Sequence, residues 1–425
     1  MTVNRVHFIG IGGIGMSGLA RLFLHEGKEV SGSDRAPSDI TKSLEKEGVK
    51  FFPSQEAANV TDGIDMVVYT EAMAKNHPEM LAAKELGIPM MNYFEALAAV
   101  ANEYFLIAVS GTHGKTTTTA MLIDILEEAS YDPTAIVGSL RSKTGSNYRA
   151  GKSKYFVVEA CEYREDFRYL KPDVLVITNL EHEHVDYYKN LAEVQAAFRR
   201  LAESVPDDGV VICDASDPNL QPVIAEITKS HISYRDCIDL TLDLKQPGLH
   251  NRLNAAAATV AAKFIGIEEG TAKAALENFA GTWRRFEYKG EVNGAPVYDD
   301  YAHHPTEITA TIDGVRELYP DKKLTIVFQS HTYTRTHELF SDFVKSLVKA
   351  DRVLMLPIYS AREENVSGVS AEKLLEEIGK EGTETAFFQT MEAAALAVKE
   401  SVGPDDVVVV MGAGEVTKVA SLLTE

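Results

Sequence analysis

The stretch that decides the fold is Phe105-Leu106-Ile107-Ala108-Val109-Ser110-Gly111-Thr112-His113-Gly114-Lys115-Thr116-Thr117-Thr118. Its apolar first half suits a strand that is buried on both faces, and a helical pattern runs from Thr116 to Glu128. The Gly-Lys-Thr sequence between them is typical of a shortened P-loop, because the usual pattern has glycine where this chain has Val109. We expect Lys115 to oppose charge on the β- and γ-phosphates of a nucleotide, and the Thr116 hydroxyl to help hold Mg²⁺.

A second glycine turn lies near the start of the chain. Gly10-Ile11-Gly12-Gly13-Ile14-Gly15 matches the GxGxxG pattern, and Asp34 follows near the expected distance. Taken alone, this pattern indicates a Rossmann domain that holds NAD or FAD, or a tight strand–helix turn without a ligand. Two glycine turns about one domain apart favour two phosphorylated ligands. The simplest account is an enzyme that brings a nucleotide-linked substrate to ATP.

Apolar runs alternate with helical patterns along the whole chain. The expected strands are 6–11, 65–69, 105–109, 155–159, 174–178, 210–213, 324–328, 353–356 and 407–411. The expected helices include 17–26, 116–128, 192–204, 254–264 and 336–349. Such alternation predicts an α/β fold with open parallel sheets.

Acidic and histidine side chains cluster where two of these strands end. One cluster runs from Val158 to Glu162 and the other from Thr178 to Asp186. Ligands of open parallel sheets gather beyond the carboxyl ends of strands. Glu162 therefore suits Mg²⁺, and His184 could complete a second metal site. The alternative is that these are solvated loop charges. Zinc is disfavoured, because no further ligands follow at zinc spacing.

Composition narrows the class of protein. The chain has 425 residues, which favours two or three domains, and a net charge of −21 that argues against non-specific nucleic-acid binding. Its three cysteines, Cys161, Cys213 and Cys237, have no CxxC spacing and fit a reducing cytosol. No segment is apolar enough for a membrane span, so we expect a cytoplasmic protein.

Motifs along nearly the whole length resemble the Mur ligases, which build the cytoplasmic peptidoglycan precursor. They are VHFIGIGGIGMSGLA, VSGSD, GTHGKTTTT, GSNYRAG, VVEACE, TNLEHEHVD, PGLHNRLNA, RRFE, YDDYAHHPTEI, FQSHTYTRT, YSAREE and MGAGEVTK. The resemblance implies three α/β domains: a Rossmann-like UDP-binding domain at 1–104, a P-loop ATPase domain with a parallel sheet at 105–283, and a Rossmann-like domain at 284–425 that closes over ATP and the amino acid.

The resemblance also implies the reaction and its ligands. L-alanine is joined to the lactyl carboxylate of UDP-N-acetylmuramate at the expense of ATP, through an acyl phosphate and with Mg²⁺. We expect no nucleic-acid or membrane partner, and a monomer or a homodimer. The first turn then binds UDP instead of NAD or FAD.

Site residues are carried over one by one. The UDP-sugar site is expected to comprise Gly12, Gly13, Ile14, Met16, Ser17, Ser33, Asp34, Thr70, Glu71 and Ala72. The ATP site is expected to comprise Gly111, Thr112, His113, Gly114, Lys115, Thr116, Thr117, His250, Asn251, Asn254, Arg285 and Asp300. The metal ligands are expected to be Thr116, Glu162 and His184, and the catalytic residues Lys115, Glu162, His184, Arg285, His303 and Arg335.

The chain departs from the family's pattern at four places. Cys161 stands where the family has Asp, Glu183 and Glu415 each replace Asp, and the stretch 214–246 is short, which predicts that outer strands of the central domain are trimmed. These changes bear on metal affinity more than on the reaction class.

Three rival functions remain open from the sequence. They are a ligase that joins a preformed tripeptide to the same sugar nucleotide in cell-wall recycling, an NAD-dependent oxidoreductase, and a non-catalytic nucleotide sensor. The Ser330–Thr336 run favours the alanine ligase over the recycling ligase.

Overall fold

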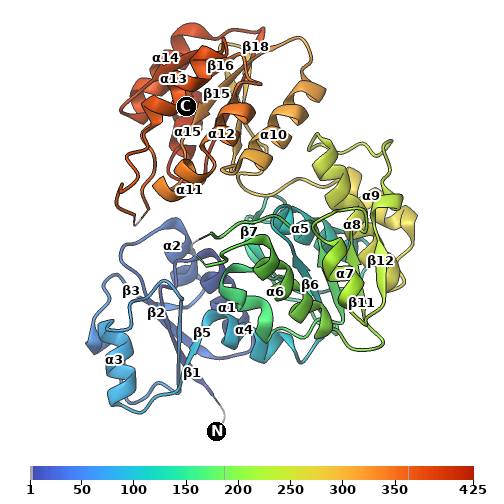
Figure 1. The fold of residues 1–425 in the computed structure, drawn as a ribbon. Coiled ribbons are helices and arrows are strands. Elements are labelled where there is room, and N and C mark those ends of the chain that lie inside the picture. The colour runs from blue at the N-terminus through green and yellow to red at the C-terminus, as the bar shows by residue number, and fades with distance from the viewer. Residues whose placement is uncertain (1–2, 186, 362) are drawn as a thin grey trace. The chain divides into compact units, whose positions relative to one another are not determined.

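The computed structural model describes residues 3–185, 187–361 and 363–425. Asp186 and Arg362, which belong to two of the motifs above, lie outside the described residues. Contacts divide the chain into two compact units (Figure 1): unit 1 comprises Met1–Asp243 with Leu253–Ala280, and unit 2 comprises Leu244–Arg252 with Gly281–Glu425. Two sheets belong to unit 1, and a third belongs to unit 2.

The first sheet of unit 1 is parallel throughout, with the strand order β3-β2-β1-β4-β5. Its elements are β1 (Arg5–Ile9), α1 (Ile14–His25), β2 (Glu29–Ser33), α2 (Asp39–Lys46), β3 (Lys50–Phe52), η1 (Ala57–Asn59), β4 (Met66–Tyr69), α3 (Pro78–Glu85), β5 (Met90–Asn92) and α4 (Tyr93–Ala101). The strand order reverses beside β1, and such a switch point is where open α/β sheets bind ligands. The first glycine turn leaves β1 at this point.

The second sheet of unit 1 has the order β12-β11-β10-β6-β9-β7-β8, with only the β7–β8 pair antiparallel. Its elements are β6 (Phe105–Ser110), α5 (Lys115–Glu128), β7 (Thr134–Arg141), β8 (Ser146–Arg149), β9 (Tyr155–Glu159), η2 (Tyr163–Tyr169), β10 (Val174–Ile177), α6 (Leu191–Glu203), β11 (Val210–Cys213), α7 (Gln221–Glu226), β12 (His231–Ser233), η3 (Arg235–Cys237), α8 (Leu249–Phe264) and α9 (Glu269–Glu277). The P-loop strand β6 is central, so the turn after it sits between the ends of β9 and β10. Between β12 and α8, a stretch that the structure describes completely, the only regular element is η3.

The two sheets of unit 1 share a core and a polar bridge. Phe8 of the first sheet and Phe156 of the second belong to one apolar cluster, and both are fully buried. Asn147 of β8 is also fully buried. Its amide nitrogen donates to the backbone oxygen of Ile14, and its amide oxygen accepts from Arg21 at 2.8 Å. The start of α1 is therefore held against the β7–β8 hairpin.

Unit 2 is built on one sheet with the order β13-β14-β18-β15-β16-β17, in which only the β13–β14 hairpin is antiparallel. Its elements are β13 (Glu287–Val292), β14 (Ala295–Asp300), α10 (Pro305–Leu318), β15 (Lys323–Phe328), α11 (Tyr333–Glu338), α12 (Phe340–Leu347), β16 (Arg352–Met355), α13 (Ala371–Lys380), β17 (Glu384–Phe387), α14 (Met391–Ser401), β18 (Asp406–Met411) and α15 (Thr417–Thr424). Val327 and Phe328 alternate across β15 into two different apolar clusters, and both are fully buried. The sheet is thus covered on both faces, which explains its unbroken apolar runs.

One predicted helix is wrong in extent. The single helix expected over 336–349 is two helices, α11 and α12, separated at Leu339, whose φ is −102° and ψ is 20°. Leu339 and Phe340 both pack against the apolar cluster of unit 2, so the break turns two consecutive apolar side chains toward the core.

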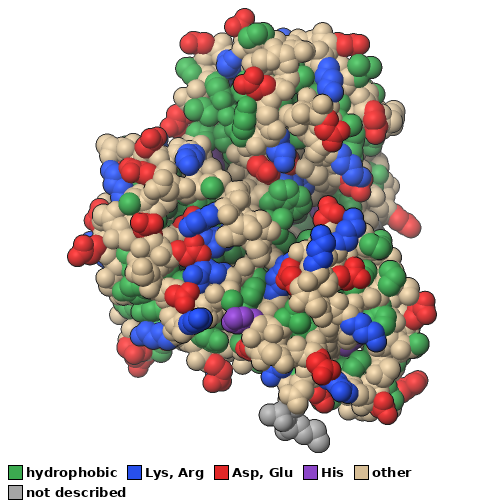
Figure 2. Space-filling model, turned by 180° about the vertical axis from the view of Figure 1, so that it is seen from behind, with side chains coloured by type: hydrophobic (Ala, Val, Ile, Leu, Met, Phe, Trp, Pro, Cys, Tyr) green, Lys and Arg blue, Asp and Glu red, His purple; other side chains and the backbone are tan. Residues whose placement is uncertain are grey.

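The described surface carries mixed charge. Figure 2 shows acidic and basic side chains interspersed with apolar ones over the face seen from behind. Among the described residues, no helix is both long and apolar enough to cross a membrane. The fold class predicted from the sequence, α/β with mostly parallel sheets, is confirmed.

Candidate functional site

The second glycine turn has the backbone that phosphate binding needs. Gly111 and Gly114 have left-handed φ values of +124° and +82°. A side chain at Gly111 would lie 2.9 Å from the backbone nitrogen of Thr178, and one at Gly114 would collide with the amide of Asn254. Both positions therefore require glycine. Helix α5 then starts at Lys115 without a side-chain cap, which leaves backbone amides open to an anion.

Lys115 is folded onto its own turn. Its ammonium donates to the backbone oxygens of Gly111 (2.6 Å) and Thr112 (3.0 Å), and it lies 2.9 Å from a carboxylate oxygen of Glu162. Burial opposes the charge of Lys115, but the Glu162 carboxylate raises the pKa of Lys115 above its ordinary range. Lys115 is therefore a fixed positive charge at the start of α5.

Glu162 is the centre of an acidic and histidine cluster. Its carboxylate lies 3.3 Å from His184 Nε2, and one ligand atom from each of Glu162, Glu183 and His184 lies within 4.8 Å of the others. Burial would raise the pKa of Glu162, but Lys115 and His184 together lower it to about 2. Its Oε1 accepts a hydrogen bond from Lys115 at 3.1 Å, and its buried Oε2 lies 2.9 Å from the same ammonium. Two carboxylates and an imidazole at this spacing fit a divalent cation that prefers oxygen ligands, such as Mg²⁺.

The Thr116 hydroxyl, which we expect to help hold Mg²⁺, is engaged by a carboxylate. It donates to Oε2 of Glu159 at 2.8 Å, and the same oxygen accepts the backbone N–H of Gly138 at 3.0 Å. Sequence reasoning noted Glu159 only as part of a strand-end cluster and assigned it no role. Cys161 lies two residues further on, and burial first and Glu162 second raise the pKa of its thiol to about 12. Cys161 is therefore a neutral thiol next to the cluster.

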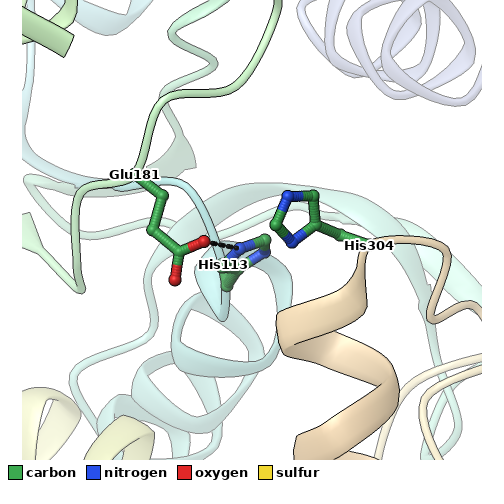
Figure 3. A group of neighbouring side chains, drawn as sticks. All are labelled: His113, Glu181 and His304. Atoms are coloured by element: carbon green, nitrogen blue, oxygen red, sulfur yellow. Dashed lines mark ion pairs between the residues drawn. The ribbon is translucent and has the colours of Figure 1, made fainter. Parts of the chain in front are cut away.

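The loop after β10 is tied to the glycine turn. His113 Nε2 lies 3.5 Å from a carboxylate oxygen of Glu181, as the dashed line in Figure 3 marks. The backbone N–H of Glu181 donates to the Thr112 hydroxyl at 2.8 Å, and that of His113 donates to Asn179 at 2.9 Å. Glu181 and Asn179 thus support the turn, although the sequence assigned neither of them to the site. Thr117 is buried in the first turn of α5.

One acidic side chain, Asp34, accepts a hydrogen bond from the backbone of the first glycine turn. The backbone N–H of Gly12 donates to Asp34 Oδ2 at 2.8 Å. A side chain at Gly12 would lie 2.8 Å from that same oxygen, so glycine is required for this approach. The Ser33 hydroxyl donates to Glu79 at 2.6 Å, and both residues are fully buried. The Ser33 hydroxyl is therefore used in a hydrogen bond inside the first domain.

The start of α1 and the loop after β4 lie beside this turn. Helix α1 begins after Gly13 without a side-chain cap, and Met16 and Ser17 are buried in its first turn. A side chain at Gly10 would lie 2.7 Å from the methyl group of Thr70. The expected sugar-nucleotide residues from Gly12 to Ala72 are thus brought to one edge of the first sheet. Glu71 pairs with Arg164 at 3.8 Å.

Unit 2 brings Arg285, Asp300 and His303 together. Arg285 lies 3.7 Å from Glu307 and over the Tyr301 ring, and His303 lies 3.3 Å from the same Glu307. Burial raises the pKa of Asp300 to about 6, although Arg285 opposes this shift. Two backbone N–H groups donate to its carboxylate, at 2.8 and 2.7 Å. Glu307 is a residue that sequence reasoning missed.

Arg335 lies in an aromatic environment. Its guanidinium is 3.4 Å from His331 Nδ1, and the His331 ring stacks on Tyr359 with centroids 5.6 Å apart. His303 meets the same His331 ring at 5.9 Å. Burial, with smaller contributions from the neighbouring His303 and Arg335, lowers the pKa of His331 to about 4. His331 and Tyr359 stood in quoted motifs, yet neither had been assigned to the site.

The segment expected to contact adenine is divided between the units. His250 and Asn251 belong to unit 2, where burial lowers the pKa of His250 to about 4 and Asn251 donates to the backbone oxygen of Pro247 at 2.9 Å. Asn254 belongs to unit 1, beside Gly114.

Comparison with known families decides the identity of this arrangement. Residues 5–105 match the model described as the Mur ligase family catalytic domain, 109–237 the Mur ligase middle domain, and 284–414 the Mur ligase glutamate ligase domain. A curated relative from Caldanaerobacter subterraneus subsp. tengcongensis is 40% identical over 450 residues, covering 99% of this chain and 97% of the relative. The chain belongs to the Mur ligase family.

The relatives of this Mur ligase have full-length similarity to it. The Caldanaerobacter protein is named UDP-N-acetylmuramate–L-alanine ligase, as is a relative from Agathobacter rectalis that is 39% identical over 97% of this chain and 96% of its own length. Among solved structures, the UDP-N-acetylmuramate–alanine ligase of Thermotoga maritima aligns with a TM-score of 0.82 at 28% identity, over 98% of this chain and 97% of its own. A murein peptide ligase from Psychrobacter arcticus aligns with a TM-score of 0.72 at 26% identity, over 99% and 98%.

Proposed function

We propose that this Mur ligase joins L-alanine to UDP-N-acetylmuramate with cleavage of ATP to ADP and phosphate. The observation that carries the proposal is the Lys115–Glu162–His184 group at the end of the P-loop strand, in a chain 40% identical over its full length to a protein of that name. An NAD-dependent oxidoreductase would use only the first glycine turn. It would give no role to the Lys115–Glu162–His184 group.

The chemistry follows from charge. The lactyl carboxylate of the sugar attacks the γ-phosphorus of ATP, forming an acyl phosphate and releasing ADP. Because two anions must approach each other, Lys115 stabilises the phosphate oxygens as their charge shifts. Mg²⁺, when bound by Glu162 and His184 with the help of Thr116, would supply further positive charge to those oxygens. The ion pair between Lys115 and Glu162 holds both groups at the turn before the nucleotide arrives.

The second half of the reaction forms the amide. The amine of L-alanine attacks the acyl carbon, phosphate leaves, and one proton is lost from nitrogen. We assign Arg335 to the amino-acid carboxylate, Arg285 to ATP phosphate, and His303 to the amine proton. Asp300 keeps its place next to Arg285 through its two backbone hydrogen bonds. His250, Asn251 and Asn254 are assigned to adenine.

The remaining assignments follow from the same function. The residues from Gly12 to Ser17, with Asp34 and the 70–72 loop, bind the UDP part. Domain boundaries near 104 and 283 separate UDP binding, ATP binding and amino-acid binding. We place the enzyme in the cytoplasm, where its substrates are made, as a monomer or homodimer with no nucleic-acid or membrane partner.

A second candidate is the ligase that joins a preformed peptide to the same sugar nucleotide. The similarity to the Psychrobacter arcticus murein peptide ligase, over nearly the whole of both chains, favours it. The two candidates differ in the amine they accept, so one assay separates them.

The test is release of phosphate from ATP and Mg²⁺ in the presence of UDP-N-acetylmuramate. L-alanine, glycine, L-serine and the L-alanyl-γ-D-glutamyl-diaminopimelate tripeptide are compared as amines. Release that requires both the sugar nucleotide and L-alanine supports the proposal, and release with the tripeptide alone contradicts it. Lys115→Met serves as the inactive control.

A further inference from the structure

Two enclosed tyrosines of unit 1, Tyr93 and Tyr148, differ from Tyr131 and Tyr188 because their hydroxyls make no hydrogen bond with a described residue. Tyr188 donates its hydroxyl to the backbone oxygen of Glu162 at 2.6 Å, and Tyr131 donates to Ile265 at 3.1 Å. Buried tyrosines ordinarily satisfy their hydroxyl in this way. Tyr93 is half-buried, and no described residue makes a hydrogen bond with its hydroxyl. It therefore carries a polar group that is available to a ligand.

The place of Tyr93 is set by the first sheet. It is the first residue of α4, directly after β5, and the preceding Asn92 caps the helix by accepting the backbone N–H of Glu95 at 2.8 Å. A side chain at Gly15 would lie 2.8 Å from Cζ of Tyr93 and 3.0 Å from its hydroxyl oxygen. The ring thus covers the third glycine of the first turn, and the hydroxyl lies beside the first turn of α1.

The Tyr93 hydroxyl also lies within electrostatic range of residues in the ATP-binding half of unit 1. Burial first, and then the carboxylate of Glu159, raise the pKa of Tyr93 above its ordinary value, with a smaller effect of the nearby Cys161. The phenol is therefore a hydrogen-bond donor throughout the physiological pH range. Glu159 is the last residue of β9 and accepts the hydroxyl of Thr116, and Cys161 follows two residues later.

Strand β7 contacts elements that follow both glycine turns, α1 after the first and Glu159 beside the second. A side chain at Gly18 of α1 would lie 3.0 Å from a β7 side chain, and Gly138 further along β7 donates to Glu159. Since Glu159 in turn holds Thr116, the starts of α1 and α5 flank one strand. Tyr93, which covers Gly15 in the first turn of α1, lies at the α1 end of a path from a diphosphate there to a γ-phosphate at α5.

We propose that the Tyr93 hydroxyl donates a hydrogen bond to the N-acetylmuramoyl part of UDP-N-acetylmuramate, and so aligns the lactyl carboxylate with ATP. This inference rests on the proposed function. The muramoyl part offers acceptor oxygens between the diphosphate and the carboxylate, whereas UDP ends before it. Tyr93 acts as a positioning residue, because it orients the substrate and takes no part in bond making.

Tyr93→Phe tests the inference, with Tyr148→Phe as the matched control. Tyr148 lies on β8 in the same unit, and its hydroxyl is likewise buried without a hydrogen bond to a described residue. Neither substitution removes an internal hydrogen bond, so both variants are expected to fold. For Tyr93→Phe, we expect the KM for UDP-N-acetylmuramate to rise about tenfold, the loss typical of one substrate hydrogen bond. The KM for ATP and the inhibition constant of UDP should change less than about twofold, as should every constant of Tyr148→Phe.

Failure of the proposed function and failure of the Tyr93 inference give different results. If the wild-type enzyme does not release phosphate with the sugar nucleotide, the proposed function fails. If the wild type is active and Tyr93→Phe keeps the wild-type KM, the inference alone fails. Equal weakening of UDP and UDP-N-acetylmuramate would place the contact on the diphosphate and refute the muramoyl assignment.

Discussion

Replacing Asn147 is expected to weaken the contact between the two sheet domains of unit 1. Its amide nitrogen donates to the Ile14 backbone oxygen and, at 3.1 Å, to the Ser17 hydroxyl, while its oxygen accepts from Arg21 at 2.8 Å. These partners lie at and after the start of α1. Asn147→Ala removes all three hydrogen bonds in a fully buried place, and Asn147→Asp removes only the two donated ones.

The magnitude follows from the number of bonds. Each buried hydrogen bond contributes about 1 kcal/mol net, so Asn147→Ala should lower the free energy of unfolding by about 3 kcal/mol. Asn147→Asp should lose at least about 2 kcal/mol, because its carboxylate also faces the Ile14 oxygen. Since α1 begins the predicted diphosphate site, the KM for UDP-N-acetylmuramate should rise in both variants, and the KM for ATP should not.

Urea denaturation, followed by tryptophan fluorescence and circular dichroism, measures the stability change. Asn278→Ala is the control: its amide donates to the Ala274 backbone oxygen at 2.9 Å, but the residue is exposed, so the loss should stay below about 0.5 kcal/mol. A loss in Asn147→Ala as small as that of Asn278→Ala would refute the idea that this amide joins the two halves.

Three further substitutions probe the ATP-binding turn. Lys115→Met should lower phosphate release by more than about 100-fold, as removal of a transition-state charge does, and leave calorimetric binding of UDP-N-acetylmuramate intact; parallel loss of both would contradict separate sites. Gly111→Ala should abolish binding of ATP in calorimetry, because its methyl group would lie 2.9 Å from the Thr178 nitrogen at a φ of +124°; unaltered binding would show that the turn adapts. Cys161→Asp should lower the Mg²⁺ concentration for half-maximal rate by about threefold or more, since added ligand charge tightens cation binding; an unchanged titration would remove Cys161 from the site.

Long apolar runs made much of the fold predictable. Strands such as β6 and β9 are covered on both faces, and every residue in them is apolar except the last, Ser110 in β6 and Glu159 in β9, so each run stands out from its surroundings. The β8 strand, Ser146–Arg149, carries no such signal, because only its pairing with β7 makes it a strand. Several of the missed strands, including β3 and β5, are three residues long, too short to show a period.

The site was predictable wherever a residue's role depends on its neighbours in sequence. Lys115 follows its glycines directly, and its pairing with Glu162 could be anticipated because both lie at carboxyl ends of adjacent strands. The hydrogen bond from Thr116 to Glu159 and the stacking of His331 on Tyr359 join residues far apart in the chain. No local pattern indicates such pairs, and only the folded structure reveals them.

The central claim is that the sugar carboxylate becomes an acyl phosphate before alanine is added. The direct measurement uses UDP-N-acetylmuramate labelled with ¹⁸O in the lactyl carboxylate, together with ATP, Mg²⁺ and L-alanine. Mass spectrometry then follows the label in the phosphate and the amide product. The account predicts transfer of one ¹⁸O atom to phosphate for each molecule of UDP-N-acetylmuramoyl-L-alanine formed. Amide formation with unlabelled phosphate, or no amide with L-alanine, would contradict it.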